Sequence, residues 1–192
     1  MGAYTELKQR LIKAARLAEK EGLCRHKSGN FSICIRDDNK LLISPSGFYR
    51  AGLTADDIIV ADFAGNIVEN INDRKASIEL MMHIAAYQAR SDIGAVVHTH
   101  STYASAFAVR GIKISPVVTE AVFYGRNVEL VPYAGPGSAG LAENVKGPIK
   151  KADVCLLENH GVIAVADNIE NALLKAFYVE DVAKIEAISR IL

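Results

Sequence analysis

Two histidines follow a run of small apolar residues in the middle of this 192-residue chain. The segment Ala95-Val96-Val97 is typical of a buried strand, and His98 and His100 stand at its end, two positions apart. Because alternate residues of a strand point to the same face of a sheet, both imidazoles are expected to lie side by side. Neighbouring nitrogen ligands of this kind suit a zinc ion. The segment therefore predicts a sheet with a metal site at the end of one strand.

A second apolar segment, 154–157, is followed by His160 and a glycine turn. With His98 and His100 it completes three nitrogen ligands, the number that a catalytic zinc site commonly uses while one position stays open. Three neutral ligands leave the cation most of its charge, which suits an electrophile that stabilises an anion. Zinc is the expected metal, with manganese or cobalt as alternatives, because nitrogen-rich sites accept all three.

Three other titratable residues lie near predicted elements. Glu79 lies near the start of a predicted helix and has two readings that the residues alone leave open. It is either a first-turn acid favoured by the helix dipole or a carboxylate close to the metal that serves as a base. His26 is expected in a solvated loop, and His83 is expected to be packed or exposed rather than to bind the metal.

Three short polar clusters stand at the boundaries of predicted elements. They are Ser28-Gly29-Asn30, Ser46-Gly47 and Ser77. Glycine lets backbone N–H groups approach an anion, serine and asparagine add donors, and a helix N-terminus at Ser77 adds its dipole. Together the clusters could bind a phosphate without a lysine, although each one alone is more typical of a turn.

The remaining pattern predicts a single domain over residues 1–192 in which strands and helices alternate. Strands are expected at 31–35, 41–43, 58–62, 67–68, 95–97, 117–118, 128–131, 154–157 and 162–166. Helices are expected near 7–18, 77–89, 103–109 and 139–151, and in a closing helix capped by Asn168. Because several strands are joined by hairpins, the sheet should be mixed, with helices on both sides.

The helix over 77–89 carries the most detailed prediction. Ser77 is expected to be its N-cap. Its buried stripe is expected to consist of Ile78, Met81, Met82, Ala85 and Ala89.

Composition and charge exclude some classes of protein. The chain has 22 Lys and Arg against 22 Asp and Glu, so it lacks the positive field of a nucleic-acid-binding protein. No apolar run approaches the roughly 20 residues of a membrane-spanning helix. The first residues predict an amphipathic helix rather than a signal peptide. Cys24, Cys34 and Cys155 are scattered and odd in number, which favours reduced thiols in a cytoplasmic protein.

The order of these motifs resembles the class II aldolase/adducin family, especially its L-fuculose-phosphate aldolase branch. The motifs in chain order are Ser-Gly-Asn at 28–30, Ser-Pro-Ser-Gly at 44–47, Ser-x-Glu at 77–79, His-Thr-His-Ser at 98–101 and Asn-His-Gly at 159–161. The likeness extends from about Leu7 to the last helix, so it covers nearly the whole chain.

The resemblance implies a three-layer α/β/α fold around a central mixed, largely antiparallel sheet. It also implies a homotetramer whose active sites lie between neighbouring subunits. Zinc would bind His98, His100 and His160, and Glu79 would ligate the metal until substrate binds and then act as the base. The substrate phosphate would be bound by the polar clusters, namely Ser28, Gly29, Asn30, Ser46, Gly47 and Ser77.

The implied reaction is the reversible cleavage of a ketose 1-phosphate, similar to L-fuculose 1-phosphate, to dihydroxyacetone phosphate and an aldehyde. Zinc would stabilise the enediolate, while Glu79 would remove a carbon-bound proton from the donor in the direction of condensation. The implied partner is therefore a small sugar phosphate.

Three positions depart from the family's pattern. Ile78 stands where a second serine is common, no tyrosine occurs at 118–120 where the fuculose-type enzymes place an acid, and no tyrosine stands in a tail before Leu192. The proton donor to the aldehyde side is therefore unassigned, with Glu120 and Tyr124 as candidates.

Other activities of the superfamily are alternatives to the aldolase. A 4-epimerase, a dehydratase or a decarboxylase would reuse a metal-held enediolate or a related anion. The 4-epimerases have an aspartate just before a Phe-Tyr-Gly sequence, where this chain has Ala121 and Val122. A non-catalytic adducin-like scaffold would lose metal ligands, whereas this chain keeps all three histidines and Glu79. The aldolase is the preferred prediction.

Overall fold

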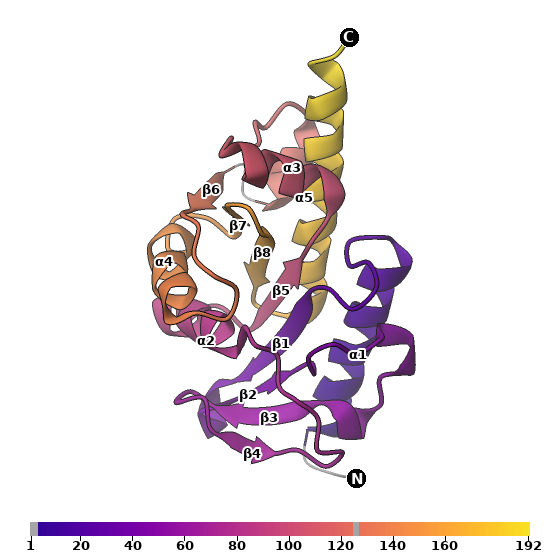
Figure 1. Cartoon of the computed structure of the whole chain (residues 1–192), viewed down its shortest axis with the longest axis vertical. Coiled ribbons are helices and arrows are strands. Elements are labelled where there is room, and N and C mark those ends of the chain that lie inside the picture. Colours follow the sequence, from indigo (N-terminus) through magenta and orange to yellow (C-terminus); the bar gives the residue numbers. More distant parts are fainter. Residues whose placement is uncertain (1–3, 125–126) are drawn as a thin grey trace.

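The computed structural model describes residues 4–124 and 127–192, which form one open sheet with helices on both faces (Figure 1). The strands in these stretches are β1 Asn30–Ile35, β2 Lys40–Ile43, β3 Ile59–Asp62, β4 Ile67–Glu69, β5 Ala95–Thr99, β6 Val128–Val131, β7 Val154–Leu157 and β8 Gly161–Ala166. Their order across the sheet is β4-β3-β2-β1-β5-β8-β7-β6. Neighbours are antiparallel except β6 and β7, which are parallel. The predicted mixed, largely antiparallel sheet is confirmed.

Helices form the two outer layers. The α-helices of the described residues are α1 Thr5–Lys20, α2 Leu80–Ala89, α3 Thr102–Arg110, α4 Ala139–Ile149 and α5 Ile169–Ser189. The apolar side chains of α1, α3 and α5 form one core cluster with one face of the sheet. Those of α2 and α4 form a second cluster on the opposite face, on the left in Figure 1. The predicted three-layer α/β/α architecture is therefore confirmed.

Strand β5 lies in the middle of the sheet and is buried on both faces. Ala95 and Val97 pack into the cluster of α1, α3 and α5, whereas Val96 packs against α2 and α4. Because side chains alternate along a strand, His98 shares the face of Val96. A site at the end of β5 therefore forms on the side of the sheet that α2 and α4 cover.

Helix α2 begins later than the sequence predicts. It starts at Leu80, and Glu79 occupies the N-cap position in place of Ser77. The Ser77 hydroxyl instead accepts a hydrogen bond from the backbone N–H of Glu79, at 3.3 Å. This local turn satisfies the backbone before the helix begins, so the prediction that Ser77 is the N-cap is wrong.

The later start also changes the buried face of α2. Met82 and Ala85 are buried as expected, and Ala89 is partly buried. Ile78 and Met81, however, are 53% and 43% exposed. Residue 78 precedes the helix, so the helical period counted from it assigns the wrong positions to the core.

The strand expected at 117–118 is absent from the part of the chain that the structure describes. The backbone N–H of Val117 donates to the carbonyl oxygen of Ser115 at 2.8 Å, which closes a tight local turn. Two β-branched residues were too short a pattern to predict a strand, because β propensity depends on cross-strand packing that two residues do not define.

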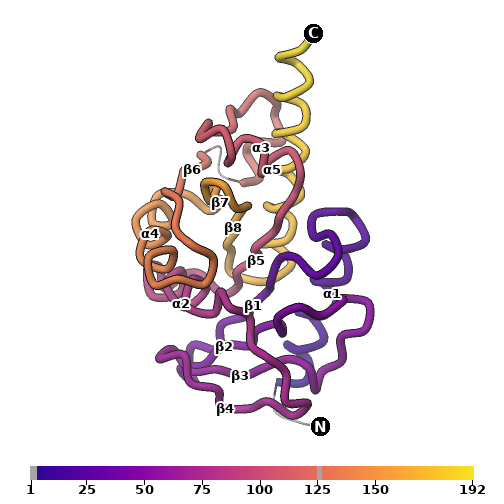
Figure 2. The backbone as a smooth tube through the Cα atoms, viewed as in Figure 1, coloured from indigo at the N-terminus to yellow at the C-terminus, as the bar shows by residue number. Residues whose placement is uncertain are grey.

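The closing helix is capped as predicted, because the Asn168 side chain accepts a hydrogen bond from the backbone N–H of Asn171 at 2.9 Å. Figure 2 shows this helix, in yellow, continuing past the edge of the sheet to the C-terminus. Within the two described stretches, no helix is both long and apolar enough to cross a membrane. The three cysteines are free thiols.

Candidate active site

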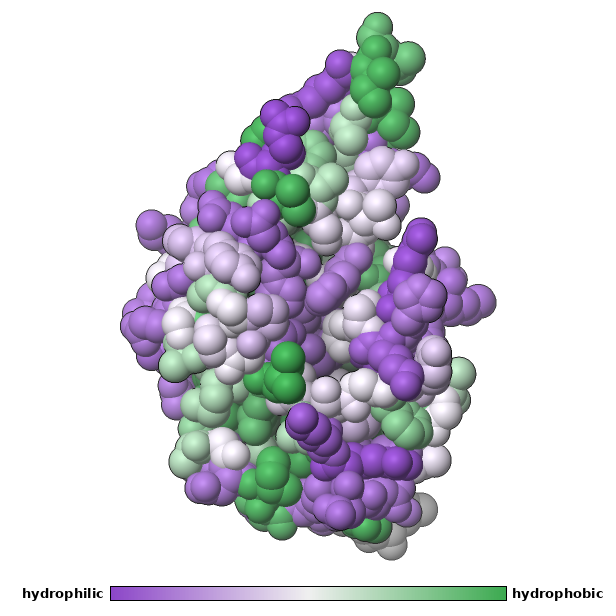
Figure 3. All heavy atoms as spheres, viewed as in Figure 1, coloured by the Kyte–Doolittle hydropathy of each residue, from purple (hydrophilic) through white to green (hydrophobic). Residues whose placement is uncertain are grey.

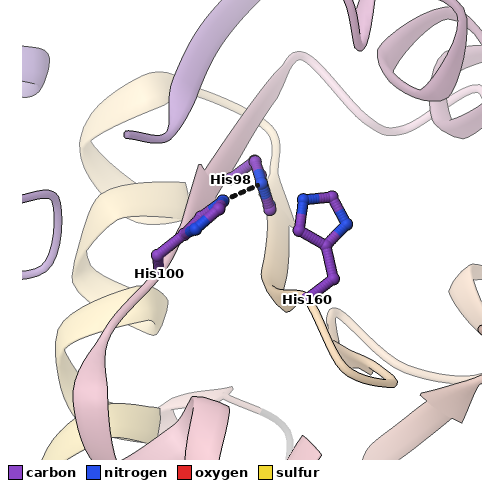
Figure 4. A group of neighbouring side chains, drawn as sticks. All are labelled: His98, His100 and His160. Carbon is purple, nitrogen blue, oxygen red and sulfur yellow. Dashed lines mark hydrogen bonds between the residues drawn. The ribbon is translucent and has the colours of Figure 1, made fainter. Parts of the chain in front are cut away.

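The three predicted metal-binding histidines lie together at one end of the central strands (Figure 4). His98 and His100 come from the end of β5, and His160 comes from the turn between β7 and β8. Strands β5 and β8 are neighbours, with Thr99 paired to Val162, so the turn before β8 lies beside the end of β5. The ring centroids are 4.8, 4.8 and 5.1 Å apart. The ligand nitrogens lie within 4.8 Å of one another, as binding to one ion requires.

His98 has one ring nitrogen available to a cation. Its Nδ1 is 2.8 Å from the carbonyl oxygen of Val162, so this nitrogen donates a hydrogen bond and carries the proton. The Nε2 lone pair then faces Nε2 of His100 at 2.9 Å and the Glu79 carboxylate at 3.0 Å. Lone pairs this close repel one another unless a proton or a cation lies between them. The donor set therefore fits a divalent metal ion.

Burial keeps two of these imidazoles neutral. Burial, followed by the electrostatic effect of the neighbouring His98, lowers the pKa of His100 to about 4. The pKa of His160 is also lowered, chiefly by burial. The Nδ1 atom of His160 is buried without a hydrogen-bond partner among the described residues. Neutral imidazole is the form that binds a metal, so these residues suit a cation.

Glu79 lies against the histidines, in the position expected of a carboxylate close to the metal. Only 3% of the residue is exposed. Its Oε2 accepts a hydrogen bond from Asn30 Nδ2 at 2.9 Å, and its Oε1 is 3.2 Å from Nε2 of His160. Burial alone would raise the pKa of Glu79, but His98, Asn30 and His160 together outweigh it. The pKa is therefore lowered, and the carboxylate is ionised.

Local backbone geometry explains the Asn-His-Gly sequence. Asn159 has φ of 55°, in the left-handed region that asparagine tolerates. A Cβ atom on Gly161 would lie 2.4 Å from the carbonyl oxygen of Thr99. Only glycine allows β8 to approach β5 this closely, and this approach brings His160 to the other two histidines.

A cleft of about 220 Å³ joins the histidines to the polar loops. It is lined by Lys27, Gly29, Asn30, Pro45, Ser46, Gly47, Ser77, Ile78, Glu79, His100, Pro136 and His160. Segments far apart in the sequence thus form one concave surface that combines a carboxylate and imidazoles with hydroxyls and glycines. Such an arrangement is suited to a small polar ligand.

Two of the predicted phosphate-binding residues have other contacts. Ser28 does not line the cleft, and its hydroxyl donates to the carbonyl oxygen of Arg25 at 2.8 Å. Asn30 does line it, but its side chain is hydrogen-bonded to Glu79 and to His83. Gly29, Ser46, Gly47 and Ser77 also line the cleft, and the Ser77 hydroxyl accepts from the backbone N–H of Glu79, which leaves its own O–H to donate.

The other histidines lie away from the proposed ligands. His26 is exposed, in the loop after α1. His83 is fully buried, as one of the two readings of the sequence expected, and it bonds Asn30 and Ser32 rather than the three-histidine group. Neither Glu120 nor Tyr124 lines the cleft. Tyr124 is buried, and this burial, followed by the charge of Glu186, raises its pKa to about 12.

Sequence reasoning missed two basic residues, Lys27 at the cleft and Arg50 behind the loop that lines it. Lys27 lines it, although the sequence suggested a phosphate site without a lysine; its position directly before Ser-Gly-Asn was the available signal. Arg50 is 1% exposed and donates to the carbonyl oxygens of Lys27, Ser28 and Gly29. Because each peptide N–H points away from its carbonyl, this fixes the direction of the loop's donors. No sequence pattern indicated that Arg50 would be buried.

Comparison with known proteins agrees with this geometry. The chain matches the family model described as "Class II Aldolase and Adducin N-terminal domain" over residues 9–187. An L-fuculose phosphate aldolase of Methanococcus maripaludis is 38% identical over 177 residues, which cover 92% of this chain and 94% of that protein. A 5-deoxy-D-ribulose 1-phosphate aldolase of Bacillus thuringiensis is 39% identical over 165 residues, covering 85% and 76% of the two chains.

A solved structure of an L-fuculose 1-phosphate aldolase superimposes with a TM-score of 0.93. Its sequence is 33% identical, and the match covers 98% of this chain and 90% of that one. The sequence motifs, the layered fold and the arrangement of the histidines all agree with these similarities. The chain therefore belongs to the class II aldolase and adducin family.

Proposed function

We propose that this protein is a metal-dependent aldolase that reversibly cleaves a ketose 1-phosphate to dihydroxyacetone phosphate and an aldehyde. One observation carries the proposal: the cleft that Glu79, His100 and His160 line is also lined by serines and glycines. A donor with a phosphate at one end and a carbonyl near the other needs both groups in one cleft. The similarity to sugar-phosphate aldolases supports the same reading.

His98, His100 and His160 hold the metal in this proposal, because their nitrogens converge within 4.8 Å of one another. Zinc is the proposed ion, with manganese or cobalt as alternatives. When bound, such a cation supplies Lewis-acid stabilisation of the negative charge that develops on the donor's oxygens.

Glu79 is the proposed base. Its carboxylate is ionised and buried, and it reaches the same point as the histidine nitrogens. In the condensation direction it takes a proton from carbon of the donor, and in cleavage it returns that proton. Exclusion of water from the buried carboxylate strengthens its interaction with the developing charge.

The substrate phosphate is proposed to bind at the loops. Gly29, Ser46, Gly47 and Ser77 supply donors at the cleft, and Ser28 and Asn30 support the loop through their local hydrogen bonds. Lys27 adds a positive charge to this group. A lysine beside backbone N–H groups is a favourable combination for a phosphate dianion.

We also propose that residues 1–192 form one domain of a cytoplasmic homotetramer with active sites at subunit interfaces. The end of α5 and the residues after it support self-association, because they expose apolar side chains, and Figure 3 shows hydrophobic surface at the top of the molecule. These side chains are Ile185, Ile188, Ile191 and Leu192. A neighbouring subunit could supply the unassigned proton donor to the aldehyde. The free cysteines agree with a reducing compartment.

The decisive experiment is product analysis of the zinc-loaded protein against a panel of ketose 1-phosphates. The panel includes L-fuculose 1-phosphate and 5-deoxy-D-ribulose 1-phosphate, and each reaction is run with and without a chelator. We expect chelator-sensitive release of dihydroxyacetone phosphate, and the best substrate identifies the aldehyde. Release of water or carbon dioxide would instead assign a dehydratase or a decarboxylase. A protein that binds no zinc would favour the scaffold.

A further inference from the structure

A chain of buried polar side chains leads from the interior of the α2 layer to Glu79. His83, on α2, has its Nε2 2.5 Å from Oδ1 of Asn30 and its Nδ1 2.6 Å from the hydroxyl of Ser32. Asn30 in turn contacts Oε2 of Glu79 at 2.9 Å. The imidazole of His83 is fully buried and has no contact with the three-histidine group. Its contacts with Asn30 and Ser32 therefore leave it one task, which is to hold the Asn30 amide in place.

The direction of every hydrogen bond in this chain follows from Glu79. An ionised carboxylate only accepts, so the NH₂ group of Asn30 must face it. The carbonyl oxygen Oδ1 of Asn30 then faces His83, so Nε2 of His83 must carry the proton and donate it. The Nδ1 lone pair of His83 accepts from the Ser32 hydroxyl. One tautomer of His83 thus fixes one orientation of Asn30.

We propose that His83 is a positioning residue that, through Asn30, fixes which oxygen of Glu79 is free to act. Asn30 engages Oε2, whereas the buried Oε1 makes no hydrogen bond among the described residues and faces Nε2 of His160 at 3.2 Å. Oε1 therefore stays available to a cation or to a proton from carbon. The inference rests on the proposed function of Glu79 and adds a residue that touches neither metal nor substrate.

His83 is needed because the Asn30 amide alone would not hold the Glu79 carboxylate. If the amide could flip, the carboxylate could still rotate. An Asn30 turned by 180° would present its oxygen to the Glu79 carboxylate, and the two would repel. His83 prevents the flip, because its Nε2–H needs an acceptor and finds Oδ1. Removing an outer partner that orients a metal ligand in this way typically lowers metal affinity or activity by about 10- to 100-fold.

The test compares two substitutions of His83 in the full chain. His83→Phe keeps a planar ring of similar size and removes both hydrogen bonds, whereas His83→Gln keeps an N–H donor that can reach Asn30. We expect His83→Phe to weaken zinc binding, measured by chelator competition without substrate, by about 10- to 100-fold. We expect its kcat to fall by a similar factor while KM changes by less than about threefold, and His83→Gln to recover most of both losses.

Tyr87→Phe is the matched control, because Tyr87 is also fully packed on α2 and bonds the Ser32 hydroxyl at 2.6 Å. Loss of the Tyr87 hydroxyl leaves the contacts of His83 with Ser32 and Asn30 in place. Near-normal zinc affinity and kcat in Tyr87→Phe support the proposal. An equal loss in this control, or no recovery in His83→Gln, would show a packing role and overturn it.

Two measurements test the role of His83 even if a variant fails to fold or the proposed reaction proves wrong. Nitrogen-15 NMR of the wild-type protein should find the proton of His83 on Nε2, and a proton on Nδ1 overturns the proposal even where His83→Phe does not fold. Zinc affinity is measured without substrate. If wild-type protein binds zinc but cleaves no ketose 1-phosphate, the proposed function fails while the His83 comparison still decides this inference.

Discussion

At the scale of single residues, Glu79 offers the most direct test of the proposed chemistry. Its carboxylate meets the histidine nitrogens, and its side chain also accepts from Asn30. Glu79→Gln keeps the size of the side chain and an oxygen that can accept from Asn30, but it removes the base. We expect kcat to fall by about 100-fold or more, because general base catalysis contributes at least this much.

Zinc binding should largely survive in Glu79→Gln, because the three histidines remain. The matched control is Glu143→Gln, on the exposed side of α4, which should leave both zinc binding and turnover unchanged. Steady-state kinetics and chelator competition measure the two effects. A Glu79→Gln variant with a near-normal rate would remove Glu79 from the role of base.

At the scale of elements, the loop before β1 depends on a single buried side chain. The guanidinium of Arg50 donates to four backbone carbonyl oxygens, those of Phe48, Lys27, Ser28 and Gly29. Gly29 adds a second restraint, since a Cβ there would be 2.7 Å from the carbonyl oxygen of His98. The loop that lines the cleft is thus fixed to Arg50 on one side and to the end of β5 on the other.

Arg50→Met should therefore destabilise the protein by about 3 kcal/mol, because several buried carbonyls lose a charged donor. Denaturant unfolding measures this change. Arg16→Met is the control: its guanidinium bonds the carbonyl oxygens of Arg50 and Leu53 from an exposed helix position, and about 1 kcal/mol is expected. Equal losses in the two variants would contradict the special role of the buried Arg50.

At the scale of the whole molecule, buried neutral histidines make stability depend on pH. Burial lowers the pKa of His83 from 6.5 to about 3. The unfolded chain therefore binds more protons than the folded one between these values, and stability is full above about pH 6.5 and falls as the pH falls towards 3. His83 alone should cost about 2 kcal/mol between pH 7 and pH 5.

Denaturant unfolding at pH 7 and pH 5, in the presence of a chelator, measures this loss. His100 shifts in the same direction, so the wild-type protein should lose more than the share of His83. His83→Gln cannot take up the proton and should lose less stability over the same interval. Parallel pH profiles for wild type and His83→Gln would mean that His83 is not the source.

The apolar end of α5 predicts how the whole molecule assembles. Ile188 is 43% exposed on this helix. We expect light scattering to give the mass of four chains for the wild type. Ile188→Asp should lower that mass, because a charge would be buried in the interface, while Ile188→Val keeps an apolar contact and should remain tetrameric. A monomeric wild-type protein would contradict the proposed tetramer.

The sequence by itself determined which residues are the candidates for the proposed chemistry. His-x-His at a strand end and His160 before a glycine were readable because strand alternation and short turns are local properties. The same local patterns predicted the layers and the mixed sheet. Local reasoning was wrong where neighbours decided the outcome, as at Ser77, where a turn precedes the helix, and at Val117, which is not in a strand.

The tertiary structure alone decided how those residues meet. The pairing of β5 with β8 brings His160 to His98 across more than sixty positions of sequence. It also placed Glu79 against the histidine nitrogens, enclosed the Arg50 side chain behind the loop and joined His83 to Asn30. These contacts are long-range, and no local pattern encodes them, because burial and partner choice arise only when separate segments pack together.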